Sequence, residues 1–254
     1  MAGHSKWANI KHRKGAQDKK RAKIFTRLIK EISVAVKESG PDADTNPRLR
    51  LAIQNAKGEN MPKDTIERAI KKASGAEADN YTEVTFEGYA PHGIAIFIEA
   101  TTDNNNRTVS SVRSTFNKYG GSLGTNGSLE FIFDRKGVFS ITKEALQQRN
   151  AEELEMELID GGLQEIDKGE ERITLYTSFE DFGNMQKLLD DLEITVKSSD
   201  LQRIPKTTEA LDLEKAQQVL SIIDKFEDDD DVNTVYHNLE LTDELIAAIE
   251  SEED

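Results

Sequence analysis

The sequence contains no cysteine and no long apolar run. The absence of cysteine excludes disulfides, thiolate catalysis and Cys-ligated zinc or iron–sulfur sites. No apolar run approaches the roughly 18 residues that a membrane-spanning helix needs. The N-terminus also lacks the apolar core of a secretory signal and is instead basic, a composition shared with mitochondrial transit peptides. A transit peptide is disfavoured, because the basic segment continues into a predicted helix. We therefore expect a cytoplasmic protein without a membrane partner.

Enzyme signatures are missing as well. The chain has no His-Glu-x-x-His, no Gly-x-Ser-x-Gly, no P-loop and no dinucleotide-binding glycine motif. Asp181-Phe182-Gly183 spells the kinase metal-binding triplet, but its companion motifs are absent, so we attribute it to chance. The four histidines have no partner at metal-ligand spacing. We therefore expect no catalytic residue, no metal site and no cofactor, and a hydrolase or nuclease is disfavoured.

Charge is present in abundance and is unevenly distributed. The 254 residues include 33 Lys+Arg and 48 Asp+Glu, a formal net charge of −15 that by itself argues against a nucleic-acid-binding protein. Residues 1–75, however, hold 18 basic and 8 acidic side chains, while the remainder holds 15 and 40. The first 30 residues contain ten basic side chains and one acid, Asp18. The chain is thus a basic N-terminal part on an acidic body.

The N-terminal part reads as a tail followed by helices. Residues 1–20 carry few apolar anchors, which predicts a flexible basic tail. From about Asp18 to Glu38, apolar residues recur at helical spacing, and Gly40-Pro41 ends the pattern. Pro47 and Pro62 each open a further short helix. These features predict a helical nucleic-acid-binding domain over residues 21–78.

From Tyr81 the hydrophobic period changes to two, which indicates strands. Residues 137–199 read as β-α-β-β-α-β, the ferredoxin-like order. The preceding segment, which includes a predicted strand at Leu129–Phe133, lacks a second helix and a last strand, and a later segment supplies both. We therefore expect an α+β protein of three domains: the three-helix domain and two ferredoxin-like α+β domains, the third inserted into the second. The predicted boundaries are 79–134 with 205–240 for the discontinuous domain, 135–204 for the inserted domain, and 241–254 for an acidic C-terminal helix and tail.

The basic part carries the candidate nucleic-acid site. A solvated helix face usually mixes charges of both signs, whereas the arc opposite the apolar stripe of the first helix is almost uniformly basic. Trp7 adds a stacking surface of the kind used on RNA and single strands. The alternative is a basic face kept for solubility or for docking on the protein's own acidic body. The candidate residues are Lys6, Trp7, Lys11, His12, Arg13, Lys14, Lys19, Lys20, Lys23, Arg27 and Lys30.

Three polar segments have competing interpretations. The loop between a strand and a helix with Asp103, Asn104, Asn105, Asn106 and Arg107 is either an Asx-rich helix cap or a second contact loop for RNA or protein. The acidic run 228–231 has no calcium-loop spacing and is expected to be a solvated loop. The glycine-rich stretch 120–127 could cradle a phosphate, but no helix follows it directly, so a flexible connection is favoured.

Several motifs resemble those of one known family. The opening MAGHSKWANIKHRK at residues 1–14 is similar to the start of the YebC/PmpR family. NMPKD at 60–64, IERA at 66–69, EGYAPHG at 87–93 and TDNNNRT at 102–108 are similar to its other hallmarks. The resemblance covers nearly the whole chain. It implies a helical domain and two α+β domains, and a DNA-binding transcriptional regulator that is not an enzyme. Relatives that include a mitochondrial translational activator of cytochrome c oxidase imply action on ribosomes at proline runs.

Two functional hypotheses follow. The first is a non-enzymatic regulator of transcription that binds DNA through its basic N-terminal region, although no plausible recognition helix for sequence readout is evident. The second is a ribosome-associated translation factor whose basic part binds ribosomal RNA or tRNA, with the 103–107 loop reaching a functional centre.

Overall fold

The computed structural model of this chain describes residues 17–76, 78–142, 151–169 and 172–251. These residues fall into two compact units. The first unit comprises residues 1–34, 76–134 and 204–254, and the second comprises residues 35–75 and 135–203. Each unit contains one four-stranded sheet.

The sheet of the first unit grows from one hairpin. β1 (Thr82–Tyr89) and β2 (Ala95–Thr102) pair antiparallel through the short 3-10 turn Pro91–Gly93, where His92 and Gly93 take φ of 64° and 81°. β3 (Ser122–Leu123) adds to β1, and β8 (Val232–His237) adds to β2 from the far end of the chain. The resulting order is β3-β1-β2-β8.

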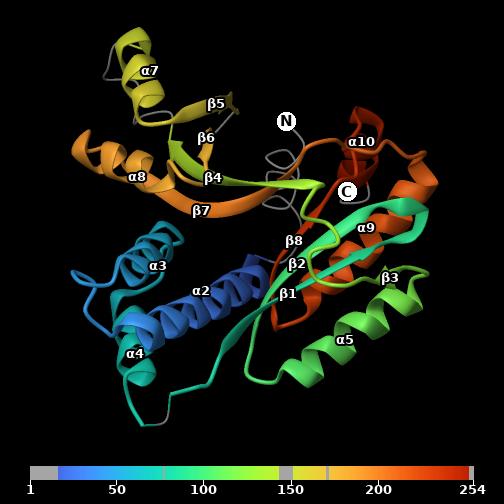
Figure 1. Ribbon diagram of the computed structural model, residues 1–254, viewed down its shortest axis with the longest axis horizontal. Helices are drawn as coiled ribbons and strands as arrows, with labels where there is room; N and C mark the ends of the chain where they lie inside the picture. The colour runs from blue at the N-terminus through green and yellow to red at the C-terminus, as the bar shows by residue number, and fades with distance from the viewer. Residues whose placement is uncertain (1–16, 77, 143–150, 170–171, 252–254) are drawn as a thin grey trace. The chain divides into compact units, whose positions relative to one another are not determined.

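Two helices, α5 (Asn105–Lys118) and α9 (Leu213–Asp228), cover one face of this sheet (Figure 1). Their apolar stripes, which include Phe116 and Phe226, pack with the inward side chains of the strands. The helix α10 (Asp243–Ser251) adds to the same core. A smaller apolar cluster contains Ala95, Phe97, Leu129, Phe133 and Tyr236. Burial of these apolar side chains holds the discontinuous segments together.

The second unit contains a sheet of order β5-β6-β4-β7. Two helices pack on it, and their buried side chains join those of the strands in one apolar core. The strands and helices alternate as β-α-β-β-α-β, which with this sheet order is the ferredoxin-like arrangement. In chain order the elements are β4 (Phe133–Thr142), α7 (Ala151–Asp160), β5 (Leu163–Lys168), β6 (Arg172–Ser178), α8 (Phe182–Asp191) and β7 (Val196–Pro205).

Three helices come from the N-terminal part: α2 (Gln17–Ser39), α3 (Pro47–Gly58) and α4 (Lys63–Ala73). Asn46 fixes the link between the first two. Its Oδ1 accepts from the backbone N–H of Leu49 at 2.9 Å, and its Nδ2 donates to the carbonyls of Ala35 and Gly40, each at 2.8 Å. The residue thus caps the N-terminus of α3 and satisfies two carbonyls at the C-terminal end of α2.

In the second unit, α3 is joined to the edge strand β7 by a side chain. The buried Asn55 accepts from the backbone N–H of Ser199 at 3.0 Å and donates to the carbonyl of the same residue at 3.0 Å. This amide reproduces the pair of bonds that a neighbouring strand would make. Gly58 allows the close approach, because a Cβ there would overlap the carbonyl oxygen of Lys197.

The fold class predicted from the sequence is confirmed: helices at the N-terminus precede two α+β sheets, and the strands of the second sheet lie in sequence between parts of the first. The predicted strand Leu129–Phe133 is wrong. Residues 126–132 form turns, and the next strand, β4, begins at Phe133. The apolar alternation misled because Leu129 is buried beside a turn while Phe131 is 68% exposed. The glycine-rich stretch 120–127 is not only a connection, because it contains β3. The start of the helix predicted from Lys143 lies outside the described residues.

Candidate nucleic-acid interface

The predicted tail contacts cannot be placed from the described residues. Trp7 and the basic residues before α2 lie outside them, and Lys19 and Lys20 are described only as backbone within α2. The tail residues concerned are Lys6, Trp7, Lys11, His12, Arg13 and Lys14. Their role as nucleic-acid contacts therefore stays a prediction from the sequence.

The next cations along α2 have different environments. Arg21 is exposed, and its guanidinium lies 5.3 Å from the ring centroid of Phe25. Arg27 is half-buried and forms an ion pair with Glu31 one turn later, at 3.5 Å. Of these two arginines, only Arg21 is exposed.

Lys30 does not lie on an exposed basic face, and that expectation is wrong. Its side chain is buried, and its ammonium donates to the carbonyls of Thr101 at 2.9 Å and Asp230 at 2.7 Å. The Oδ1 of Asp231 lies 3.4 Å from the same nitrogen. The lysine is thus fully engaged inside the first unit, where no external phosphate can reach it.

Lys23, two turns earlier, faces the same acidic run. It is half-buried, and its Nζ donates to the carbonyl of Asp229 at 3.1 Å. Burial lowers the pKa of this lysine, although the charges of Asp228, Asp230 and Asp229 act in the opposite direction. For Lys23 and Lys30, the structure therefore shows docking on the protein's own acidic segment.

The carboxylate that faces Lys30 belongs to the buried Asp231, which follows α9. Its Oδ2 accepts from the guanidinium of Arg107 at 2.7 Å and from the hydroxyls of Thr108 at 2.8 Å and Thr102 at 3.1 Å. Lys30 approaches the other carboxylate oxygen. One carboxylate thus joins α2, the end of β2 and the start of α5.

These contacts shift two pKa values in opposite directions. Burial alone would raise the pKa of Asp231, but hydrogen bonds from Arg107 and Thr108 and the charge of Lys30 outweigh it, so this pKa is lowered. The hydrogen bonds from Arg107 to Asp231 and Asp103 raise the pKa of the guanidinium. Both groups are therefore charged near neutral pH.

The expectation of a wholly solvated acidic run at 228–231 is accordingly wrong in part. Asp228 and Asp230 are exposed, whereas Asp231 is buried and Asp229 accepts from the hydroxyl of Ser111 at 2.7 Å. Four consecutive aspartates in the sequence do not indicate which of them is buried. The difference follows from which of them faces α5.

The loop at 103–107 acts as a helix cap. The Oδ1 of Asn104 accepts from the backbone N–H of Arg107 at 3.1 Å, and Asn104 is the N-cap of α5. The Arg107 side chain reaches both Asp103, at 2.8 Å, and Asp231. The structure thus shows the capping role of this loop. Asn105 and Asn106 are also exposed, but their side chains take no part in the cap.

The helix α4 contains none of the contact residues predicted from the sequence. This helix presents four exposed cations, two of them in its last turn. An exposed ion pair joins Lys63 to Glu67 at 3.6 Å, which reduces the field of the first turn. The excess of basic residues that continues to residue 75 was the available signal. The four cations are Lys63, Arg68, Lys71 and Lys72.

Two other kinds of feature are absent from the part of the chain that the structure describes. It contains no group of three or more His, Asp or Glu side chains arranged to hold a metal ion. None of the described helices is both long enough and apolar enough to cross a membrane.

Comparison with known proteins identifies the family. The model of the TACO1/YebC protein N-terminal domain matches residues 5–76, and the model of the TACO1/YebC second and third domain matches residues 81–239. The chain belongs to the TACO1/YebC family. The family resemblance carried by the sequence motifs is thereby confirmed.

Curated TACO1/YebC relatives are similar over nearly their full length. A protein of Amoebophilus asiaticus is 54% identical over 94% of this chain and 98% of its own length, and one of Idiomarina loihiensis is 46% identical over 98% and 100%. Each is named a "probable transcriptional regulatory protein". The crystal structure of a conserved hypothetical protein from Aquifex aeolicus superposes with a TM-score of 0.77 at 40% identity, covering 88% of this chain and 91% of that one. The TACO1/YebC fold is thus the fold of this chain.

Proposed function

We propose that this protein is a non-enzymatic regulator of transcription that binds nucleic acid through its basic N-terminal region. The single observation that carries the proposal is the concentration of positive charge in residues 1–75, with 18 basic against 8 acidic side chains in a chain of net charge −15. Neutralising phosphates with such a cluster releases counterions and drives binding. The names of its relatives support the regulatory role.

The proposed interface omits two lysines that the sequence predicted as nucleic-acid contacts. Lys30 and Lys23 are left out, because their ammonium groups are occupied by Thr101, Asp229 and Asp230 carbonyls. In the first unit, the basic tail and the exposed Arg21 remain as proposed contacts, and in the second unit the exposed cations of α4 are proposed as contacts of their own. The acidic remainder of the chain would repel a polyanion and restrict binding to the basic segments.

A triple variant in the tail tests the proposal directly. Lys11→Glu, Arg13→Glu and Lys14→Glu together reverse three charges of the tail that the sequence predicts to be flexible, so we expect the protein to stay folded. With six to eight phosphate contacts in the natural protein, the log–log salt slope of binding should be about −4 to −7. The variant should reduce its magnitude by about 2 to 3.

A matched control reverses three charges elsewhere. Lys206, Lys215 and Lys225 are exposed and ion-paired with neighbouring carboxylates of the acidic body. Changing all three to Glu alters the net charge equally but should leave the salt slope nearly unchanged. Equal losses in both triple variants would refute the tail as the site. The measurement is fluorescence anisotropy with labelled duplex DNA and labelled single-stranded RNA over a salt series.

A second candidate function is a translation factor that binds ribosomal RNA or tRNA. Trp7, the only tryptophan, lies within the basic tail, and an aromatic among cations favours stacking on unpaired bases. Ultraviolet crosslinking in cells followed by sequencing of the bound nucleic acid separates the two functions. Recovery of ribosomal RNA or tRNA without promoter enrichment would replace the transcription proposal with this one. Enrichment of promoter DNA would exclude the translation role.

A further inference from the structure

The outer face of α5 differs in charge from the acidic segments of its unit. Apart from the basic N-terminal segment 1–34, this unit consists of residues 76–134 and 204–254, which contain 24 acidic and only six basic side chains. Four of the six cations form ion pairs with carboxylates: Arg107, Lys206, Lys215 and Lys225. The other two, Arg113 and Lys118, form no ion pair with any residue that the structure describes. Both belong to α5.

The sequence of α5 is free of acidic residues over its 14 positions. Its sides have separate tasks. Val112 and Phe116 are buried in the apolar core, while Arg107, Thr108 and Ser111 bond to the acidic segment after α9. The remaining side is exposed and has neither an apolar anchor nor a carboxylate.

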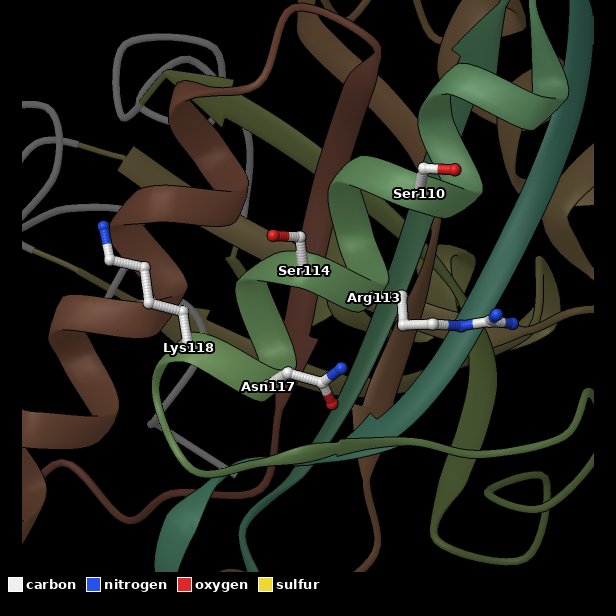
Figure 2. A pocket seen from close by; sticks show the side chains of 5 residues that line it. All are labelled: Ser110, Arg113, Ser114, Asn117 and Lys118. Atoms are coloured by element: carbon white, nitrogen blue, oxygen red, sulfur yellow. The ribbon is translucent and has the colours of Figure 1, made fainter.

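This exposed side lines an open hollow of about 660 Å³. Figure 2 shows its five side chains, with Arg113 and Lys118 extending to opposite sides of the helix and Asn117 near them. The Lys118 ammonium lies 5.9 Å from the ring centroid of its neighbour Tyr119. The lining residues are Ser110, Arg113, Ser114, Asn117 and Lys118.

We propose that this face of α5 is a second nucleic-acid contact, and that it binds the phosphate backbone through Arg113 and Lys118 with Ser114 and Asn117 beside them. Arginine, lysine, serine and asparagine side chains are those that make phosphate and sugar contacts. An acidic protein partner is less suited, because the core of a protein interface needs apolar or aromatic anchors and this face exposes none. Charge complementarity thus favours a nucleic acid as the occupant.

The local charge balance also explains why these two cations carry no carboxylate. Among the 24 acids of residues 76–134 and 204–254, an exposed cation is readily neutralised by a neighbour, as the four ion pairs show. A stretch of helix kept clear of acids preserves a positive local potential in an otherwise repulsive field. Phosphate contacts of this kind fix orientation and carry no sequence information.

The proposal rests on nucleic acid being the partner, as in the proposed function, but not on the tail being the site. The test compares the full-length protein with the double variant Arg113→Glu and Lys118→Glu. Both side chains are exposed, so circular dichroism and thermal unfolding should match the natural protein. Anisotropy is measured with labelled oligouridylate RNA, the corresponding single-stranded DNA and duplex DNA, between about 50 and 200 mM salt.

Two lost phosphate contacts should reduce the magnitude of the salt slope by about 1.4 to 1.8. The matched control is Lys215→Glu with Lys225→Glu on α9, which makes the same change in net charge where acids surround the cations. The control should retain the slope of the natural protein. The three probes assign the phosphate to RNA, single-stranded DNA or duplex DNA.

The outcomes separate this inference from the proposed function. Loss of binding in the tail variant with an unchanged α5 variant would overturn the α5 contact and leave the proposed function standing. Loss in the α5 variant alone would support this contact and remove the tail as the site. Equal losses in the α5 and α9 variants would overturn the inference. Absence of nucleic-acid binding by the natural protein would overturn both.

Discussion

Asp231→Asn should destabilise the first unit strongly, because the carboxylate of Asp231 joins three elements. Its oxygens accept from Arg107, Thr108 and Thr102 at 2.7–3.1 Å, and Lys30 lies 3.4 Å away. The substitution keeps the shape of the side chain but removes its charge. The ammonium of Lys30 then stays buried without its opposite charge.

The magnitude follows from the burial of each partner. Removing one member of a buried ion pair costs about 3–5 kcal/mol. The side chain of Arg107 is 53% exposed and keeps Asp103, so its part of the loss is small. Lys30 also retains two carbonyl acceptors. We therefore expect the free energy of unfolding to fall by about 2–4 kcal/mol at neutral pH.

The pH dependence gives an independent check. The pKa of Asp231 is lowered in the folded protein, so its stabilising effect is present above the unfolded value of about 3.9 and is lost as the pH falls through the folded pKa. The difference between the natural protein and Asp231→Asn should be constant from about pH 7 to pH 5 and shrink below about pH 4. Differential scanning calorimetry of the full chain measures it, with hydrogen exchange of residues 95–118 to report on this unit.

Asp230→Asn is the matched control, because it makes the same change of charge at the neighbouring residue, whose side chain is exposed. The backbone carbonyl of residue 230 still accepts from Lys30 in this variant. It should alter stability by no more than about 0.5 kcal/mol. The double variant Lys30→Met with Asp231→Asn should be less destabilised than the sum of the single variants, because neither charge is then left unpaired. Equal effects of the two Asn variants, or strict additivity, would refute the buried pair as the stabilising element.

Two further predictions concern the junction of α3 with β7. Asn55→Ala leaves the buried N–H and carbonyl of Ser199 without this partner, which should lower the free energy of unfolding by about 3 kcal/mol. Hydrogen exchange at the amide of Ser199 should become faster, and exchange at the natural rate would contradict the pairing. Gly58→Ala places a methyl group against the carbonyl of Lys197 and should lower the melting temperature, at a cost of about 1–3 kcal/mol, whereas Gly183→Ala in α8 has open space and should be neutral or stabilising. Equal melting temperatures for the two glycine variants would show that α3 can move away without cost.

Local patterns were enough for most of the secondary structure and for the fold class. The hairpin around Pro91–Gly93, the helix after Asn104 and the β-α-β-β-α-β order come from signals between residues near in sequence, namely period, proline, glycine and capping side chains. The predicted strand at Leu129–Phe133 failed because two-residue alternation also arises in a turn that buries one side chain. The segregation of basic and acidic residues is likewise a property of the sequence alone.

Only the tertiary structure decided which charges are available to a partner. Helical phase places Lys23 and Lys30 on one side of α2, but it cannot tell that this side meets a segment far along the chain, as Lys30 meets Asp231 at a separation of 201 residues. The same holds for the bond of Asn55 to Ser199 across 144 positions. Whether a lysine can bind phosphate or instead bonds to the protein's own acidic segment depends on what packs against it. That information resides in long-range contacts, which no local pattern encodes.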